Sequence, residues 1–113
     1  MSQLRIPVSL EILADMETPL SVFKKLGNKP FSYLFESVEG GEKWARYSLI
    51  GLPSSRVIKV YKNQIKIFNN GKIEEEITSS DPLKFLEDYQ DSIKVKLYDH
   101  LPAFTGGLVG YLG

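Results

Sequence analysis

A carboxylate, three hydroxyls and a guanidinium flank a polar connection between two apolar runs of the sequence. Glu36 and Ser37 end the first run, and Arg46, Tyr47 and Ser48 begin the second. An arginine can hold a carboxylate through two parallel hydrogen bonds, but it can equally pair with a surface glutamate. A buried serine at a strand end needs a hydrogen-bond partner, which is backbone or ligand. Taken alone, the surface ion pair and the backbone partner are the more probable interpretations.

Other residues with chemical potential do not form a reactive set. His100 is the single histidine, so neither a histidine cluster for zinc nor a serine–histidine–aspartate set with an alternative base exists. The three glutamates at 74–76 lie in a predicted strand, where neighbours alternate between faces and cannot converge on one ion. The glycine-rich end at 106–113 lacks the lysine of a phosphate-binding loop. We therefore assign no catalytic residue and no metal site to this chain.

Two short helices are expected from capping signals. Thr18 followed by Pro19 is typical of a helix start, and Gly27 is typical of a helix end. Asp81 followed by Pro82 repeats the start signal, and an apolar stripe follows it at helical spacing. Each helix is therefore expected to pack one face against a sheet.

Alternation and turn residues predict the strands. Phe31, Tyr33 and Phe35 alternate with polar or aliphatic residues, which places Ser37 on the aromatic face and Glu36 on the other. If the aromatic face is the core face, Ser37 points inward. Strands are expected at residues 31–36, 47–52, 57–61, 64–68 and 72–77, with an Asn-Gly hairpin turn at 70–71. Residues 94–102 are expected to be a linker, and residues 104–113 a strand that is cut off.

The sum of these elements is an α+β domain, an antiparallel sheet with two short helices packed on it. The chain has 113 residues, 14 basic and 14 acidic, with a net charge of zero and no cysteine. This balance gives no electrostatic footprint for nucleic acid or an anionic membrane. No signal peptide or membrane-spanning stretch is evident. We expect a single cytoplasmic domain, with no nucleic-acid and no membrane partner.

Three strings of the sequence carry a resemblance to a known family. They are IPVSLEILADMETPLSVFKKL at 6–26, LFESVEGGEKWARYSLIG at 34–51 and PAFTGGLVGYLG at 102–113. They closely resemble the N-terminal region of the large subunit, component I, of anthranilate synthases, which are chorismate-utilising enzymes. The Glu-Ser step with RYS and Gly downstream is fairly specific to the aminating branch. The pattern from Glu36 to Glu39 favours anthranilate synthase over aminodeoxychorismate synthase.

The resemblance implies a fold, an activity and a regulator. The fold would be the N-terminal part of a larger α/β sandwich. The parent enzymes are lyases of tryptophan biosynthesis that convert chorismate and glutamine-derived ammonia to anthranilate and pyruvate. They use Mg²⁺ and a glutamine amidotransferase partner, component II, and L-tryptophan inhibits them allosterically.

The resemblance also implies an effector site for L-tryptophan. The family's effector-binding serine falls on Ser37, beside Glu36, and a second contact falls around Arg46 to Ser48. Glu36 and Ser37 would hold the ammonium group, and Arg46 or Ser48 the carboxylate. An apolar slot for the indole would be lined by Tyr33, Phe35 or Tyr47.

The family's chorismate- and Mg²⁺-binding residues lie in a longer C-terminal part. We therefore expect residues 1–113 to be an N-terminal domain fragment without the catalytic domain, inactive as a synthase and binding no cofactor itself. A cut final strand would leave an apolar edge, so self-association is expected. Two alternatives stay open: the same region of aminodeoxychorismate synthase, and a free-standing small binding domain.

Overall fold

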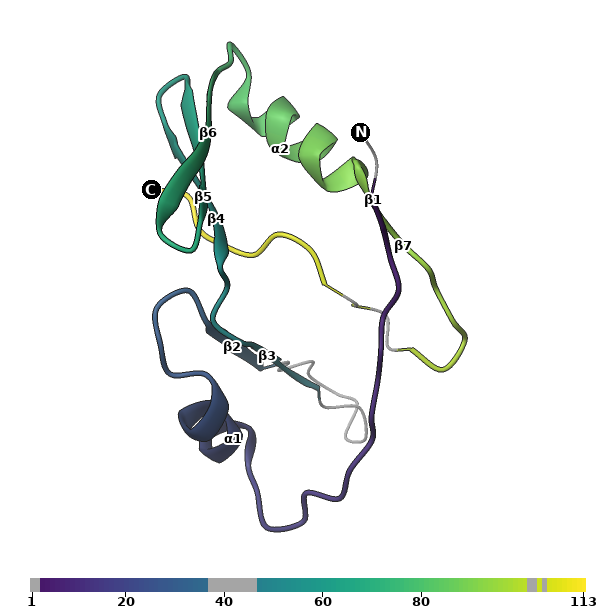
Figure 1. Ribbon diagram of the computed structural model, residues 1–113. Helices are drawn as coiled ribbons and strands as arrows, with labels where there is room; N and C mark the ends of the chain where they lie inside the picture. Colours follow the sequence, from purple (N-terminus) through teal and green to yellow (C-terminus); the bar gives the residue numbers. More distant parts are fainter. Residues whose placement is uncertain (1–2, 37–46, 102–103, 105) are drawn as a thin grey trace, which may run out of the picture. The chain divides into compact units, whose positions relative to one another are not determined.

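A computed structural model describes residues 3–36, 47–101, 104 and 106–113 of the chain (Figure 1). These residues form a mixed α+β fold with small, mostly antiparallel sheets, as the sequence predicted. Along the chain the elements are β1 (Gln3–Arg5), α1 (Pro19–Leu26), β2 (Tyr33–Glu36), β3 (Ser48–Gly51), β4 (Arg56–Tyr61), β5 (Gln64–Asn69), β6 (Lys72–Thr78), α2 (Pro82–Asp91) and β7 (Ile93–Val95).

The chain divides into two compact units. One unit contains Met1–Ile12, Val60–Ile65 and Ile77–Gly113, and the other contains Leu13–Lys59 and Lys66–Glu76. The second unit therefore holds α1, β2 and β3 and both ends of the connection that carries the predicted site.

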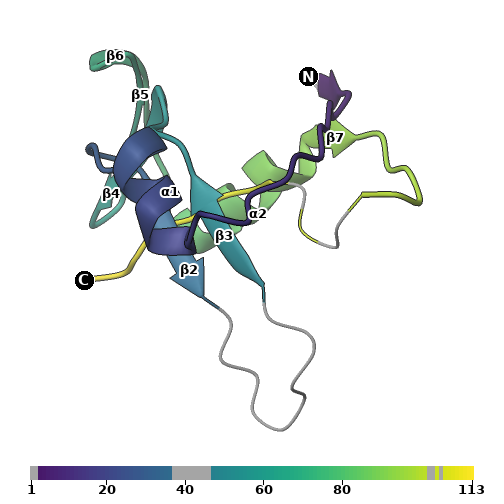
Figure 2. The same cartoon turned by 90° about the horizontal axis from the view of Figure 1, so that it is seen from below.

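Helix α1 begins and ends as the sequence predicted. The Thr18 hydroxyl accepts a hydrogen bond from the Ser21 amide at 3.1 Å, and the Ser21 hydroxyl accepts one from the Thr18 amide at 2.9 Å. This reciprocal capping box satisfies amides that the first turn leaves without helical partners. At the other end the Gly27 amide donates to the Phe23 carbonyl at 2.8 Å. The helix contacts β2 and β3, and both views show it beside this strand pair (Figures 1 and 2).

Strands β2 and β3 pair antiparallel, but both are shorter than expected. Phe31, which we expected to begin the first strand, has a φ of 65° and belongs to a turn. Its carbonyl instead accepts a hydrogen bond from the Ser54 amide at 3.1 Å. The left-handed backbone of Phe31 is incompatible with a β ladder, so β2 starts at Tyr33.

The next three strands form the predicted meander, in the order β4-β5-β6. Asn70 and Gly71 have φ values of 54° and 80°, as a type I′ hairpin turn requires. Ile65 and Ile67 lie on the central strand β5 and are the fully buried side chains of the described residues. Because they are two residues apart on a strand, their side chains point to the same face of the sheet, so this is the buried face of β5.

The sequence-based expectations missed the pairing of β1 with β7. These two strands are parallel, with Gln3 opposite Ile93 and Arg5 opposite Val95. The segment 94–102, expected to be a linker, therefore begins inside a strand. Helix α2, which precedes β7 and contacts it, is capped as predicted by the Asp81 carboxylate, which accepts from the Lys84 amide at 3.1 Å. The expected single antiparallel sheet is thus three small sheets, one of them parallel.

The prediction of a strand at 104–113 was wrong. Residues 104 and 106–113 include no strand, and Gly106 and Gly107 have φ values of 121° and 154°, which side chains rarely adopt. Four glycines in ten residues disfavour an extended ladder, and no described segment pairs with this stretch.

Candidate functional site

The β2–β3 ladder brings two of the predicted site residues together. Glu36, the last residue of β2, stands opposite Ser48, the first residue of β3. Both side chains are exposed, and neither makes a side-chain hydrogen bond or ion pair with the other described residues. The exposed Glu36 carboxylate can accept hydrogen bonds from an ammonium group, and the Ser48 hydroxyl opposite it can donate one to a carboxylate.

An aromatic pair lies on the same strand as Glu36 and gives the ladder an apolar face. The Tyr33 and Phe35 rings have centroids 4.9 Å apart and planes tilted by 36°. Tyr33 stands opposite Gly51, and its ring occupies the space where a side chain at Gly51 would begin. Phe35 is 50% exposed, so the aromatic face is not a buried core face in this chain. Because successive strand residues alternate between faces, these rings lie on the face opposite that of Glu36 and Ser48, so they do not line an apolar slot beside that pair.

The remaining predicted site residues are Ser37, Arg46 and Tyr47. Ser37 and Arg46 lie outside the described residues. Tyr47 immediately precedes β3 and is 67% exposed. Of the five predicted effector residues, the structure therefore brings Glu36 and Ser48 together, and Tyr47 immediately precedes Ser48 along the chain.

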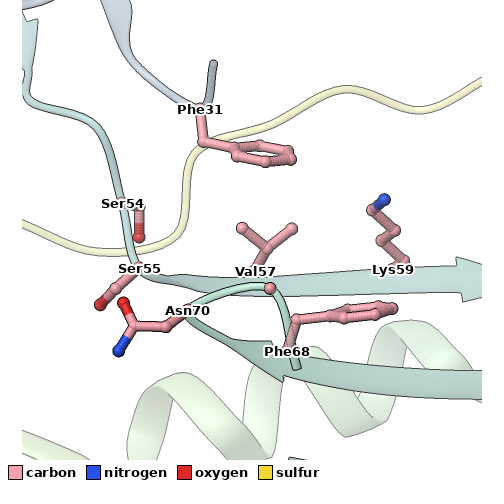
Figure 3. A pocket seen from close by; sticks show the side chains of 8 residues that line it. Phe31, Ser54, Ser55, Val57, Lys59, Phe68 and Asn70 are labelled. Atoms are coloured by element: carbon pink, nitrogen blue, oxygen red, sulfur yellow. The ribbon is translucent and has the colours of Figure 1, made fainter. Parts of the chain in front are cut away.

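A second feature of this unit was missed by the sequence analysis. A hollow of about 270 Å³ opens beside the start of β4 (Figure 3). Its walls come from three separate segments: the turn before β2, the start of β4, and the end of β5 with its hairpin turn. No local pattern signals it, because residues distant in sequence build it. Its lining includes Phe31, Ser55, Val57, Lys59, Phe68 and Asn70.

The glutamates at 74–76 and His100, to which the sequence assigned no catalytic or metal-binding role, make ordinary surface contacts in the structure. The glutamates at 74–76 are exposed, and two of them form surface ion pairs, Arg56 with Glu74 at 3.0 Å and Lys66 with Glu76 at 3.8 Å. His100 lies in a turn and stacks on Tyr98 at 5.6 Å. Among the described residues, no group of three or more acidic or histidine side chains is placed to hold a metal ion. Within the same residues, no helix has the length and apolar character needed to cross a bilayer.

Comparison with known proteins identifies relatives of this chain. No family profile and no solved structure matches it. It is 51% identical over 109 residues to anthranilate synthase component 1 of Pseudomonas aeruginosa, covering 96% of this chain and 22% of that protein. The same name belongs to relatives from Neisseria meningitidis, 48% identical over 109 residues, and Acetivibrio thermocellus, 43% identical over 108 residues. Each alignment covers 96% of this chain and 22% of the relative.

The chain thus spans about a fifth of the length of the curated relatives it matches. Identity near 50% over almost all of the chain indicates common ancestry, not merely a shared fold. Over nearly its whole length, this chain is homologous to the N-terminal 22% of anthranilate synthase component 1.

Proposed function

We propose that this chain is the N-terminal, tryptophan-sensing and structural region of an anthranilate synthase component 1. The single observation that carries the proposal is the 51% identity over 96% of the chain to a protein of that name. The parent would form anthranilate and pyruvate from chorismate and glutamine-derived ammonia. In this proposal, its Mg²⁺ site and its amidotransferase partner, component II, belong to the longer protein, of which this chain spans 22% of the length.

The proposed effector site consists of Glu36, Ser37, Arg46, Tyr47 and Ser48. Support comes from the ladder, which sets the Glu36 carboxylate opposite the Ser48 hydroxyl with neither engaged by a described side chain. An amino acid with an indole ring needs an acceptor for its ammonium, donors for its carboxylate and an apolar surface. The carboxylate of Glu36 serves the first need and the Ser48 hydroxyl serves the second. Arg46 would strengthen the second contact by charge.

This role places regulation in the chain and catalysis elsewhere. We propose that the 113-residue chain alone forms no anthranilate, since it spans only 22% of the relative that bears that name. An assay of the isolated chain with chorismate, Mg²⁺ and ammonium salts is expected to yield no anthranilate fluorescence. Production of anthranilate by the isolated chain would contradict the proposal.

The effector proposal is tested in the full protein encoded by the gene. A Ser37→Phe substitution inserts a ring where tryptophan would bind. It is therefore expected to raise the tryptophan concentration for half-inhibition by at least about tenfold, as loss of a charge-assisted contact and added bulk predict. Anthranilate formation without tryptophan should stay near the wild-type rate.

The matched control is Ser9→Phe, the same substitution in an exposed segment before α1. This variant should be inhibited like the wild type. Undiminished tryptophan inhibition in Ser37→Phe would refute the site, whereas equal loss in both variants would show a general effect of the added ring.

A further inference from the structure

Lys59 lies between two aromatic rings in the hollow beside β4. Its Nζ atom is 5.2 Å from the centroid of the Phe68 ring and 5.9 Å from that of the Phe31 ring. Both distances are within the range of cation–π attraction. In the described part of the chain, no carboxylate lies within ion-pair distance of this ammonium, whereas Arg56 and Lys66 on the neighbouring positions of the meander have glutamate partners. Lys59, which is exposed, thus presents a positive charge beside two aromatic rings without a described counter-ion.

The opposite end of the hollow is polar. Figure 3 shows Ser55 and Asn70 at the end of the hollow away from Lys59. Val57 lies between this polar end and Lys59, and the Phe31 ring lies above. The Ser55 carbonyl accepts from the Asn70 amide at 2.8 Å, which holds these two residues together. The Ser55 hydroxyl and the Asn70 side-chain amide make no hydrogen bond to other described residues, so both are available to a ligand.

Backbone strain at Phe31 accompanies this arrangement. A φ of 65° is unusual for a bulky residue and strains the backbone. The turn is held by the hydrogen bond from the Ser54 amide to the Phe31 carbonyl. Phe31 is 55% exposed, so burial of this residue does not explain the strain. The strained turn instead carries the ring to the mouth of the hollow.

We propose that this hollow binds a small aromatic carboxylate. Its carboxylate would meet the Lys59 ammonium, its ring would lie among Phe31, Val57 and Phe68, and a polar substituent opposite the carboxylate would reach Ser55 or Asn70. A volume of about 270 Å³ is below that of pockets for drug-sized ligands and fits a single ring. None of these residues belongs to the proposed effector site, so the two proposals stand independently.

Saturation-transfer NMR on the full encoded protein tests the proposal, with benzoate and 4-hydroxybenzoate as probes. We expect saturable binding in the roughly millimolar range, because so small a ligand makes few contacts. The 4-hydroxy compound should bind more tightly, and benzyl alcohol, which lacks the charge, should bind at least about fivefold more weakly. Raising the salt concentration should weaken benzoate binding.

Two lysine substitutions provide the decisive comparison. Lys59→Met removes the charge but keeps the length, and it should weaken benzoate binding at least about fivefold. Lys62→Met is the matched control, because Lys62 also lies over an aromatic ring, 5.5 Å from Tyr61, but does not line the hollow. Circular dichroism of both variants establishes that they fold. Absence of saturable binding, equal loss in both variants, or equal binding of benzyl alcohol would each overturn the proposal.

Discussion

Position 51 has no room for a side chain, because the Tyr33 ring lies where a Cβ atom would stand. The same ring lies beside Phe35, 4.9 Å between centroids, on the strand that ends at Glu36. Glycine at this position therefore lets β2 and β3 pair with an aromatic ring crossing the partner strand. One missing side chain thus sets the geometry of the ladder that carries Glu36 and Ser48.

A Gly51→Ala substitution is expected to destabilise the full encoded protein by about 1–3 kcal/mol, since the added methyl group forces the ring or the strand to move. Denaturant unfolding followed by tryptophan fluorescence or circular dichroism measures the change. Gly110→Ala is the control, because no atom lies within 4 Å of the position a Cβ would take there. Equal free energies of unfolding for the two variants would contradict this prediction, because they would show that the Tyr33 ring moves aside without loss of stability.

At the scale of elements, local sequence signals predicted the helices and the hairpin turn correctly, but they did not predict pairing between strands far apart in the sequence. Both helices begin after the expected caps, and the Asn70-Gly71 turn has the expected backbone. Strands β1 and β7 were missed because each has three residues and no alternation of its own, and each exists only through the other. The strand expected at 104–113 does not form, although this segment has apolar residues typical of a strand, because no described strand pairs with it.

The same division applies to the candidate sites. The sequence predicts two adjacent strands joined by one connection, with Glu36 and Ser48 at its ends, but the register that sets these two residues opposite each other comes from the structure. The hollow around Lys59 depends on Phe31 and Phe68, which lie 28 and 9 positions away along the chain. Only the three-dimensional pairing of β4 with β5, together with the turn at Phe31, brings these rings to the lysine.

The capping box of α1 gives a prediction at this scale. Thr18→Ala removes the hydroxyl that accepts from the Ser21 amide, and it should cost about 1 kcal/mol of stability. Thr18→Ser keeps the hydroxyl and should cost much less. The two variants are compared by thermal unfolding of the full encoded protein; equal melting temperatures would contradict a role for the cap.

The molecule as a whole exposes many large apolar side chains. In the segment before α1, Val8 is 95% exposed, Leu13 91% and Met16 94%, and Tyr111 near the other end is 96% exposed. Isolated exposed apolar residues are ordinary, but a series of them along one segment is typical of an interaction surface. The relatives are several times longer than this chain, so they have further chain able to cover such surfaces.

The isolated 113-residue chain is therefore expected to self-associate. Its sedimentation coefficient should rise with concentration, because burying exposed apolar area between copies is favourable. Replacing Leu10 and Leu13 together by serine should reduce the association, since both are strongly exposed. A monomer at high concentration, with a cooperative thermal transition, would count against this prediction.

The parallel pairing of β1 with β7 has a consequence for synthesis on the ribosome. Gln3 pairs with Ile93, so about ninety residues must be translated after the first strand before its partner exists. At roughly 5–20 residues per second, the first strand waits on the order of five to twenty seconds with open backbone groups. During that interval α1 and the β2–β3 hairpin, whose contacts are local, have ample time to form. Strand β1, although it is synthesised first, is thus among the last elements to form its hydrogen bonds.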